Sequence, residues 1–396
     1  MDETLPGELQ AIKKLARDFA RNEIDPRALE LDAAPKDRFP WDLVRKGGEV
    51  GLLSMTIPEA YGGSGQAVRA SGLVMEELCW ACAGVANIFG AHGLGLVPLF
   101  IAGSDELKER VYRDIVAAEK AERPKLAAFA ITEPGAGSDV EDEQGSKHAA
   151  LSTVAIRDGD EYVLNGRKVF ISNGSVASYI TVFATVDRAE GIKAWTCFLV
   201  TPDMKGFSVG RVEDKMGQRA CPAAELIFED MRVPKKNRVG KEKTGWFINR
   251  TTLAASRGPV GAIAVGIAQR ALDLAVAYAK ERRQAGRPII EHQAVSQKIA
   301  EMVIRVEAAR LMVRRACHLA DTSLPPPMKS AAMAKVFASD TAVFVANEAI
   351  QILGGYGYMR DFWVEKCLRD ARLTQIYEGT NEINRIAITE EIAAGR

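Results

Sequence analysis

The period of the apolar residues changes twice along this chain, and the change limits the folds that it can adopt. Residues 1–125 carry a helical period, as in "ELQAIKKLARDFARNEI". Residues 126–238 change to a period of two, which is typical of strands. From 239 to 396 the helical pattern returns in longer runs. The order predicts a mainly α protein with an N-terminal helical domain, a small middle β domain and a C-terminal four-helix bundle.

The middle region contains one strong hairpin signal and three further strand candidates. In "EYVLNGRKVFISNG" apolar residues alternate on both sides of Asn165-Gly166, a pair that favours a turn with positive φ. The stretches "YITVFATV", "AWTCFLVTP" and "AAELIFEDMRVP" are rich in β-branched and aromatic residues. The sequence therefore predicts a sheet with a hairpin turn at Asn165-Gly166.

The C-terminal region predicts long, closely packed helices. "MKSAAMAKVFASDTAVFVANEAIQIL" is rich in alanine and apolar on all sides, so we expect it to be buried on more than one face. Gly354 and Gly355 follow it and suit a helix C-cap, and they also leave bare backbone for a ligand. In "SRGPVGA", Ser256 suits an N-cap, which puts Arg257 in a first helical turn against the macrodipole. A carboxylate partner for Arg257 and a solvated arginine both stay open.

Composition argues against several classes of function. Lys+Arg and Asp+Glu are both 52, so no basic field exists to hold nucleic acid or an anionic membrane. We find no apolar run of about 18 residues and expect no membrane insertion. The N-terminus "MDETLPGEL" has no signal or transit character, so we expect a bacterial cytoplasmic protein, or a mitochondrial matrix protein if the chain is already processed.

Cysteine and histidine usage predicts neither a redox motif nor a metal centre. The six cysteines suit a reducing compartment. Cys79 and Cys82 form "CWAC", but the helical period around them favours buried thiols over a redox pair. The four histidines are widely spaced and no HExxH occurs, so no metal is expected.

Three stretches carry chemistry without revealing it alone. "FAITEPGAGSDV", which begins at Phe129, combines backbone-exposing glycines with hydroxyls, and it suits an anion-binding loop or an ordinary turn. It lacks the P-loop and Rossmann patterns. "KERRQAGRPI" places Arg282, Arg283 and Arg287 at a helix end, where cations suit the macrodipole or a phosphate. Glu378 in "QIYEGTNEINR" is either a solvated loop charge or a base.

These stretches in this order resemble the acyl-CoA dehydrogenase family. The motifs are "AFAITEPGAGSDV", "YVLNGRKVFISNG", "ERRQAGRPIIEHQAVSQKIAEM" and "AIQILGGYGYMRDFWVEKCLRDARLTQIYEGTNEINR", and the resemblance spans about the whole chain. It implies a β-barrel-like middle domain between two helical domains. It also implies non-covalent FAD, an acyl-CoA substrate, electron-transferring flavoprotein as the acceptor and a homotetramer.

The resemblance gives Glu378 a role. Its counterpart in the family removes the α-proton of the acyl thioester, while the β-hydrogen leaves as hydride to flavin N5 to give a trans-2-enoyl-CoA. The thioester oxygen receives a hydrogen bond from the main-chain N–H of the same glutamate, which acts as an oxyanion hole for the enolate.

The resemblance also assigns binding residues. The expected cofactor contacts are Phe129, Ile131, Thr132, Gly137, Ser138, Phe170, Ile171, Ser172, Gln351, Gly354, Gly355, Thr380 and Glu382. Further contacts, to the FAD of a neighbouring subunit, are expected from Arg282, Gln284, His292 and Gln293. The expected substrate contacts are Ser138, Arg257, Asn87, Gly90, Tyr377 and Gly379.

The chain departs from the family pattern in several places. Phe170 stands where a tryptophan is frequent, and Ala285 stands where an aromatic residue is usual. Ala254 replaces an aspartate that contacts CoA in some members, and residues 141–157 form a longer linker. Gly90 lies where pocket depth is set, which suggests room for a branched or cyclic acyl group. No arginine nearby would pair with a distal carboxylate, which disfavours glutaryl-CoA.

Two other functions are compatible with these residues. The same fold and flavin could serve an oxidase, a reductase or another flavin-dependent reaction on a CoA thioester. A non-catalytic helical scaffold would use the fold without the cofactor and would be colourless, whereas a flavoprotein would be yellow.

Overall fold

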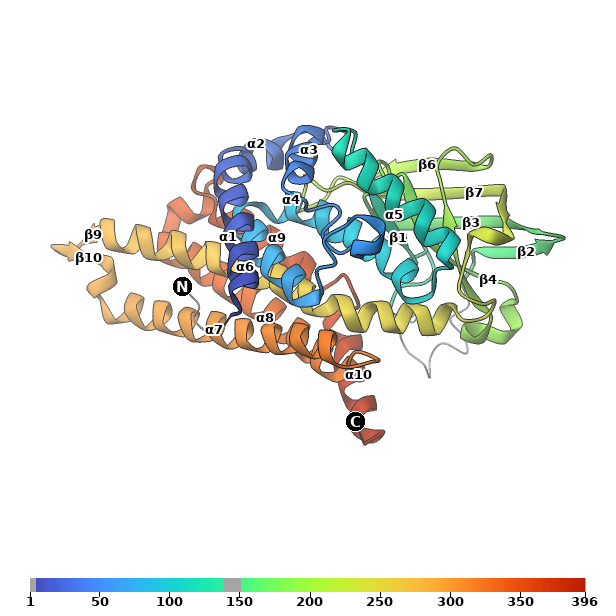
Figure 1. The fold of residues 1–396 in the computed structure, drawn as a ribbon. Helices are drawn as coiled ribbons and strands as arrows, with labels where there is room; N and C mark the ends of the chain where they lie inside the picture. Colours follow the sequence, from blue (N-terminus) through green and yellow to red (C-terminus); the bar gives the residue numbers. More distant parts are fainter. Residues whose placement is uncertain (1–4, 139–150, 396) are drawn as a thin grey trace.

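The computed structural model describes residues 5–138 and 151–395, which form three regions along one long axis (Figure 1). N-terminal helices and a C-terminal helical bundle pack together, and a sheet lies at one end of them. The predicted fold class, helices at both ends with a small sheet in the middle, is confirmed.

The N-terminal region consists of helices that pack around the long and mostly buried helix α4 (Val68–Ala102). Ser104 caps α5 by accepting a hydrogen bond from the Leu107 N–H (3.2 Å). The first turn of α4 donates two main-chain N–H groups to the carboxylate of Asp321, at 2.7 and 3.0 Å. The helices are α1 (Gly7–Phe19), α2 (Ala28–Ala33), α3 (Trp41–Glu49), α4 (Val68–Ala102) and α5 (Asp105–Lys120).

The sheet has the order β6-β7-β3-β2-β4-β5-β8, with β1 paired in parallel to β4. Its inner side chains are almost completely buried, because they are covered by the long helices α4 and α6 (Gly245–Glu281) and by the other strands of the sheet. The strands are β1 (Ala127–Ala130), β2 (Val154–Asp158), β3 (Glu161–Ser172), β4 (Tyr179–Thr185), β5 (Trp195–Val200), β6 (Phe207–Val212), β7 (Ala223–Pro234) and β8 (Arg238–Val239).

The predicted hairpin turn at Asn165-Gly166 is wrong. Strand β3 runs straight through this pair, and the turn lies earlier, where Asp158 pairs with Glu161 across a two-residue loop. Asn165 instead exchanges two hydrogen bonds with Asp230 of β7, at 2.9 and 3.1 Å. The pair therefore marks an irregularity in the β3–β7 ladder.

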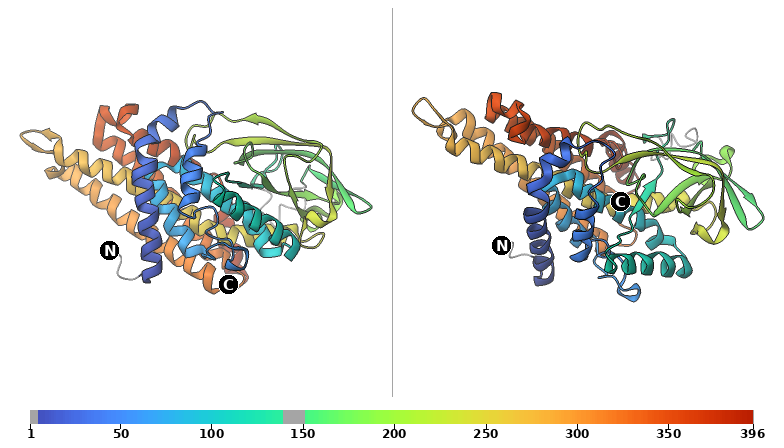
Figure 2. Two further views of the ribbon diagram at one scale, coloured as in Figure 1. Left: turned by 45° about the horizontal axis from the view of Figure 1, so that its top comes forward. Right: turned by 90° about the horizontal axis from the view of Figure 1, so that it is seen from above.

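The C-terminal bundle is built from three long helices that lie side by side in the views of Figures 1 and 2. A short hairpin of β9 (Arg283–Gln284) and β10 (Arg287–Pro288) projects from the end of the bundle opposite the sheet. The helices are α6 (Gly245–Glu281), α7 (Gln293–Thr322), α8 (Met328–Leu353), α9 (Val364–Thr374) and α10 (Asn381–Ala393). The helix end predicted at Gly354 is confirmed, with φ 60° at this C-cap.

The predicted helix start at Ser256 is wrong. Helix α6 begins at Gly245, so Ser256 and Arg257 lie in its middle and the helix continues through Pro259. A proline usually marks a first turn because it lacks an N–H, but it is also tolerated where packing on both sides holds the helix. The macrodipole argument for Arg257 therefore does not apply.

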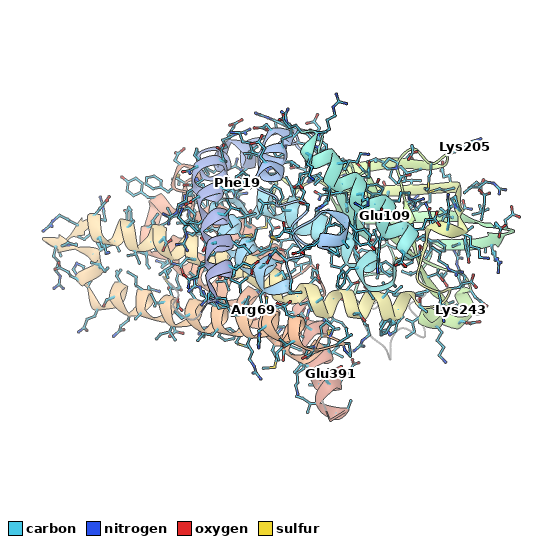
Figure 3. The ribbon with its side chains drawn as sticks, viewed as in Figure 1. Phe19, Arg69, Glu109, Lys205, Lys243 and Glu391 are labelled. Atoms are coloured by element: carbon cyan, nitrogen blue, oxygen red, sulfur yellow. The ribbon has the colours of Figure 1, made fainter. Side chains whose placement is uncertain are left out.

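Three helical stretches, Val68–Ala102, Gly245–Glu281 and Met328–Tyr358, are long and apolar enough to cross a membrane by length and composition alone. This corrects the expectation that no segment has such a composition. Half or more of each apolar window is buried inside the fold, so these faces form the core. Charged side chains such as Glu109, Lys205 and Lys243 stand on the outside of the molecule (Figure 3).

The predicted burial of the cysteines is confirmed. All six are free and buried, and burial raises the pKa of the Cys79 thiol well above its ordinary value. Cys82 sits at a kink in α4, with φ −162° and ψ 110°. A thiol with a raised pKa is a poor nucleophile, so this pair behaves as core.

Candidate active site

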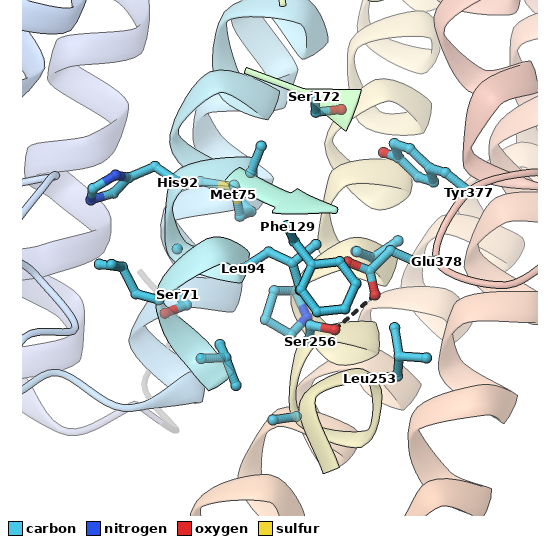
Figure 4. A pocket seen from close by; sticks show the side chains of 18 of the residues that line it. Ser71, Met75, His92, Leu94, Phe129, Ser172, Leu253, Ser256, Tyr377 and Glu378 are labelled. Atoms are coloured by element: carbon cyan, nitrogen blue, oxygen red, sulfur yellow. Dashed lines mark hydrogen bonds between the residues drawn. The ribbon is translucent and has the colours of Figure 1, made fainter. Parts of the chain in front are cut away.

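A cavity of about 1240 Å³ opens where the sheet meets the two helical regions. It is larger than the roughly 300–1,000 Å³ of a site for one small molecule. Its wall is formed by α4, the segment after β1, the end of β3, the middle of α6 and the segment 373–380 (Figure 4). Residues far apart in sequence meet here: the hydroxyls of Ser138 and Thr380 are 3.3 Å apart.

Glu378 lies in the wall of this cavity rather than on the outer surface. Its Oε2 accepts a hydrogen bond from the Ser256 hydroxyl at 2.7 Å (Figure 4). The backbone at Glu378 is left-handed, with φ 55°. A non-glycine residue adopts this conformation only where its surroundings enforce it, so the carboxylate is held in place by the fold.

Arg257 supports Glu378 from behind. Its side chain is 1% exposed, which excludes the solvated alternative. Its Nε donates to the main-chain oxygen of Glu378 at 3.1 Å. Arg257 thus contacts a carbonyl of the same segment, and its Nη1 donates to the sulfur of Met328 at 2.9 Å. Arg257 itself is not among the residues that line the cavity.

The segment after β1 is fixed by a buried ion pair. Lys168 donates to a carboxylate oxygen of Glu133 at 2.7 Å and to the main-chain oxygen of Ile131 at 2.9 Å. Burial lowers the pKa of Lys168 to about 8, although Glu133 acts in the opposite direction. This pair holds Ile131 and Thr132 against the cavity, and Gly137 and Ser138 also line it.

The end of β3 contributes Phe170, Ile171 and Ser172 to the cavity. Phe170 has φ 60° and its side chain is 64% exposed, which is unusual for a large apolar residue. An exposed aromatic ring on a strained backbone at a cavity wall suits a planar ligand.

Helix α4 contributes Asn87 and Gly90 to another part of the cavity wall. A side chain added at Gly90 would place its Cβ 3.3 Å from the sulfur of Met75, 3.8 Å from Oδ1 of Asn87 and 3.9 Å from Cδ1 of Ile263. The glycine therefore adds no side chain to a wall that is already closely packed. Tyr377 also lines the cavity, and its hydroxyl accepts a 3.4 Å hydrogen bond from the amide of Gln218.

The remaining predicted residues lie elsewhere. Near the β9–β10 hairpin, the Arg282 guanidinium lies 6.0 Å from the ring centre of Tyr356, and His292 contacts Arg287 at 3.2 Å. Within one chain, these residues around the hairpin do not reach the cavity. Residues absent from the cavity lining are Arg282, Gln284, His292, Gln293, Gln351, Gly354, Gly355 and Glu382.

Sequence reasoning missed two polar residues near Glu378. Ser256 was interpreted as an N-cap, and Lys335 drew no attention, although it donates to the Gly379 carbonyl at 2.8 Å. A signal for Lys335 existed: its neighbours at helical spacing are small or apolar, so a lysine there must be buried with a partner. Part of the longer linker at 141–157 lies outside the described residues.

No group of three or more metal-binding side chains occurs among the described residues. His92 lines the cavity but points away from Glu378 (Figure 4). Its Nε2 lies 2.9 Å from the Leu53 carbonyl, and its Nδ1 accepts from the Ala127 N–H at 3.0 Å. Both ring nitrogens are therefore engaged by main-chain groups and stabilise the fold.

Comparison with known proteins gives matches over nearly the whole chain. Residues 6–119, 128–231 and 243–393 match the models for the acyl-CoA dehydrogenase N-terminal, middle and C-terminal domains. Cyclohex-1-ene-1-carbonyl-CoA dehydrogenase of Geobacter metallireducens is 44% identical over 94% of each chain. Acryloyl-CoA reductase (NADH) of Anaerotignum propionicum is 41% identical over 99% of this chain and 96% of its own.

Solved structures agree. Butyryl-CoA dehydrogenase of Megasphaera elsdenii has a TM-score of 0.90 at 37% identity, covering 99% of this chain and 100% of its own. A structure described as the electron transferring flavoprotein of Acidaminococcus fermentans has a TM-score of 0.91 at 40% identity, covering 99% of both chains.

Proposed function

This chain belongs to the acyl-CoA dehydrogenase family, and we propose that it converts an acyl-CoA thioester into its 2-enoyl-CoA with Glu378 as the base. It is an oxidoreductase with FAD as its cofactor. The observation that carries the proposal is the placement of the Glu378 carboxylate in the cavity wall, on a left-handed backbone and 2.7 Å from the Ser256 hydroxyl.

The cavity fits FAD together with a thioester. Its volume exceeds that of a typical single-ligand site, and an exposed aromatic ring and several hydroxyls line one side. We assign Phe170 to the flavin ring and the hydroxyls of Thr132, Ser138 and Ser172 to the cofactor's polar groups. Bound FAD supplies the acceptor for the hydride that leaves the β-carbon.

The protein's own residues carry the proton. The Glu378 carboxylate takes the α-proton, and the Ser256 hydroxyl keeps the receiving oxygens oriented. Negative charge then develops on the thioester oxygen, and we assign the main-chain N–H of Glu378 to that oxygen. Positioned donors of this kind contribute roughly 3 kcal/mol to the barrier. A positioned general base contributes about 10²–10⁴ in rate.

We further propose a short, branched or cyclic acyl group without a distal charge. Gly90 adds no side chain to the wall beside Met75 and Ile263, and the described lining residues include no arginine. Two relatives are named for butyryl-CoA and for cyclohex-1-ene-1-carbonyl-CoA, and the acyl groups of both thioesters are compact. Electron-transferring flavoprotein is the proposed acceptor, which the similarity to the Acidaminococcus structure supports.

The Glu378→Gln variant tests the proposed base. It should bind FAD with an unchanged visible spectrum, while substrate reduces its flavin about 10³-fold or more slowly than in the wild type, because the amide cannot accept the α-proton. Stopped-flow bleaching of the flavin measures this with butyryl-CoA, cyclohexanecarbonyl-CoA, octanoyl-CoA and glutaryl-CoA. Bleaching at the wild-type rate would place the base elsewhere, and a clear preference for octanoyl-CoA would refute the compact acyl group.

A further inference from the structure

Lys335 of α8 is buried directly beneath the segment that carries Glu378. Its exposed fraction is 0%. The amino group donates to the main-chain oxygen of Gly379 at 2.8 Å and to Oδ1 of Asn381 at 2.9 Å. A lysine in the interior loses its hydration, so its amino group must find acceptors there, and here they come from the loop beside the cavity.

The loop backbone needs such support. Glu378 and Gly379 have φ values of 55° and 84°, so two consecutive residues are left-handed. Their carbonyls are both engaged by buried donors: Arg257 reaches the first at 3.1 Å, and Lys335 reaches the second at 2.8 Å. The amide of Asn384 also donates to the second carbonyl at 2.9 Å.

These contacts orient the base through the peptide planes. A peptide unit is planar and its C=O and N–H point in opposite directions, so fixing a carbonyl fixes the plane. The planes on both sides of Gly379 are held by Arg257 and Lys335. The first plane, held by Arg257, begins at the Cα of Glu378. The second plane, held by Lys335, fixes Gly379 on its other side, so the two donors together set the direction in which the Glu378 side chain leaves the backbone.

We propose that Lys335 is a positioning residue for Glu378, which acts on the reaction from a neighbouring helix without touching the substrate. The inference rests on the proposed role of Glu378 as the base. Lys335 is not among the residues that line the cavity, so its loss should leave binding in place and slow the proton transfer.

The test is Lys335→Met, which keeps the length of the side chain and removes the donor. Flavin content and the KM for butyryl-CoA should stay within about threefold of the wild type. The rate of flavin reduction should fall about 10- to 100-fold, because a displacement of about 1 Å at a reacting group costs up to that much. Exchange of the substrate's α-hydrogen with D₂O should slow by the same factor.

Arg310→Met is the matched control. Arg310 is also a buried cation of the bundle, but its partners are Glu76 and Gln269, at 2.8 and 2.6 Å, and Glu307. It should lower the free energy of unfolding without slowing flavin reduction at a temperature where the protein is folded. If both variants slow the reaction equally, Lys335 serves only the fold and the inference is wrong.

Asn384→Ala covers the case in which Lys335→Met does not fold. It removes the other donor to the Gly379 carbonyl and should slow flavin reduction about 3- to 10-fold. Wild-type rates in this variant or in Lys335→Met would overturn the inference while Glu378→Gln stays inactive. An active Glu378→Gln would instead remove the proposed function and this inference together.

Discussion

Two titratable side chains in the wall of one cavity, Glu378 and His92, have opposite tasks. The carboxylate of Glu378 lies on a strained backbone and meets a hydroxyl, which leaves it available to a ligand. His92 is 2% exposed and has both ring nitrogens engaged by main-chain groups. Burial lowers the pKa of His92 to about 4, so the imidazole is neutral and joins Leu53 to Ala127.

His92 makes the stability of the protein depend on pH. Between about pH 6.5 and pH 4 the unfolded chain takes up a proton at His92 and the folded chain does not, so stability is lost as pH falls through this window. The contribution is about 3 kcal/mol at most. Urea unfolding at pH 7 and pH 4.5 should show a smaller loss for His92→Gln than for the wild type. His318→Gln, on an exposed helix face, is the control, and an unchanged loss in His92→Gln would contradict the prediction.

At the scale of the elements, Gly166 shows why β3 is irregular. It has φ 150°, and a Cβ added there would lie 2.6 Å from the Cα of Thr153, the residue that precedes β2. Only glycine allows the two strands to approach so closely while β3 shifts its register against β7. The glycine is required by packing inside the sheet and not by a reversal of the chain.

Gly166→Ala should therefore destabilise the sheet more than an alanine in the real turn. We expect a loss of about 3 kcal/mol, since backbone strain and displacement of β2 act together. Gly159→Ala is the matched control, because this turn glycine has φ 62° and no atom near an added Cβ. Its cost should be about 1 kcal/mol, and urea unfolding of both variants measures the difference. Equal losses in the free energy of unfolding would mean that β2 can move away from the added Cβ at little cost.

The two errors in predicting elements have a common cause. Asn-Gly and Ser-Arg-Gly-Pro are local signals for a turn and a helix start, and both were overridden by packing. Asn165 forms hydrogen bonds with Asp230 and Gly166 packs closely against Thr153, so this pair cannot form a turn. Helix α6 continues through Pro259 because it is packed on both sides. By contrast, the periods of the apolar residues gave the fold class correctly, because they reflect the core itself.

The meeting of distant motifs was predicted only through the family resemblance. From its neighbours in sequence alone, Glu378 could be either a surface charge or a base. No local pattern predicts that Ser138 meets Thr380, which lies far away along the chain. The support by Lys335 also escaped, because the sequence around it indicates burial but not which acceptor it meets. That acceptor depends on how α8 faces the loop. Contacts of this kind are set by the packing of whole helices.

At the scale of the whole molecule, most of the predicted FAD contacts form two groups at different places. One group lines the cavity, and Arg282, Gln284, His292 and Gln293 lie around the β9–β10 hairpin at the opposite end of the bundle from the sheet (Figure 2). We propose that a second copy of the chain brings its hairpin to the cavity of the first. Each cofactor would then be held by two chains, and the homotetramer is the proposed assembly.

Mixed assemblies test this proposal. Glu378→Gln keeps its hairpin group but loses the base, whereas a chain with Arg282→Ala and Gln284→Ala keeps its base but should bind FAD weakly. When the two chains carry different tags and are purified together, a cavity with a working base can meet an intact hairpin. We expect turnover above that of either variant alone, because a cavity with a working base then binds FAD with the intact hairpin of its neighbour. If turnover in the mixture merely averages the two parents, each chain holds its cofactor by itself, and the hairpin group has another role.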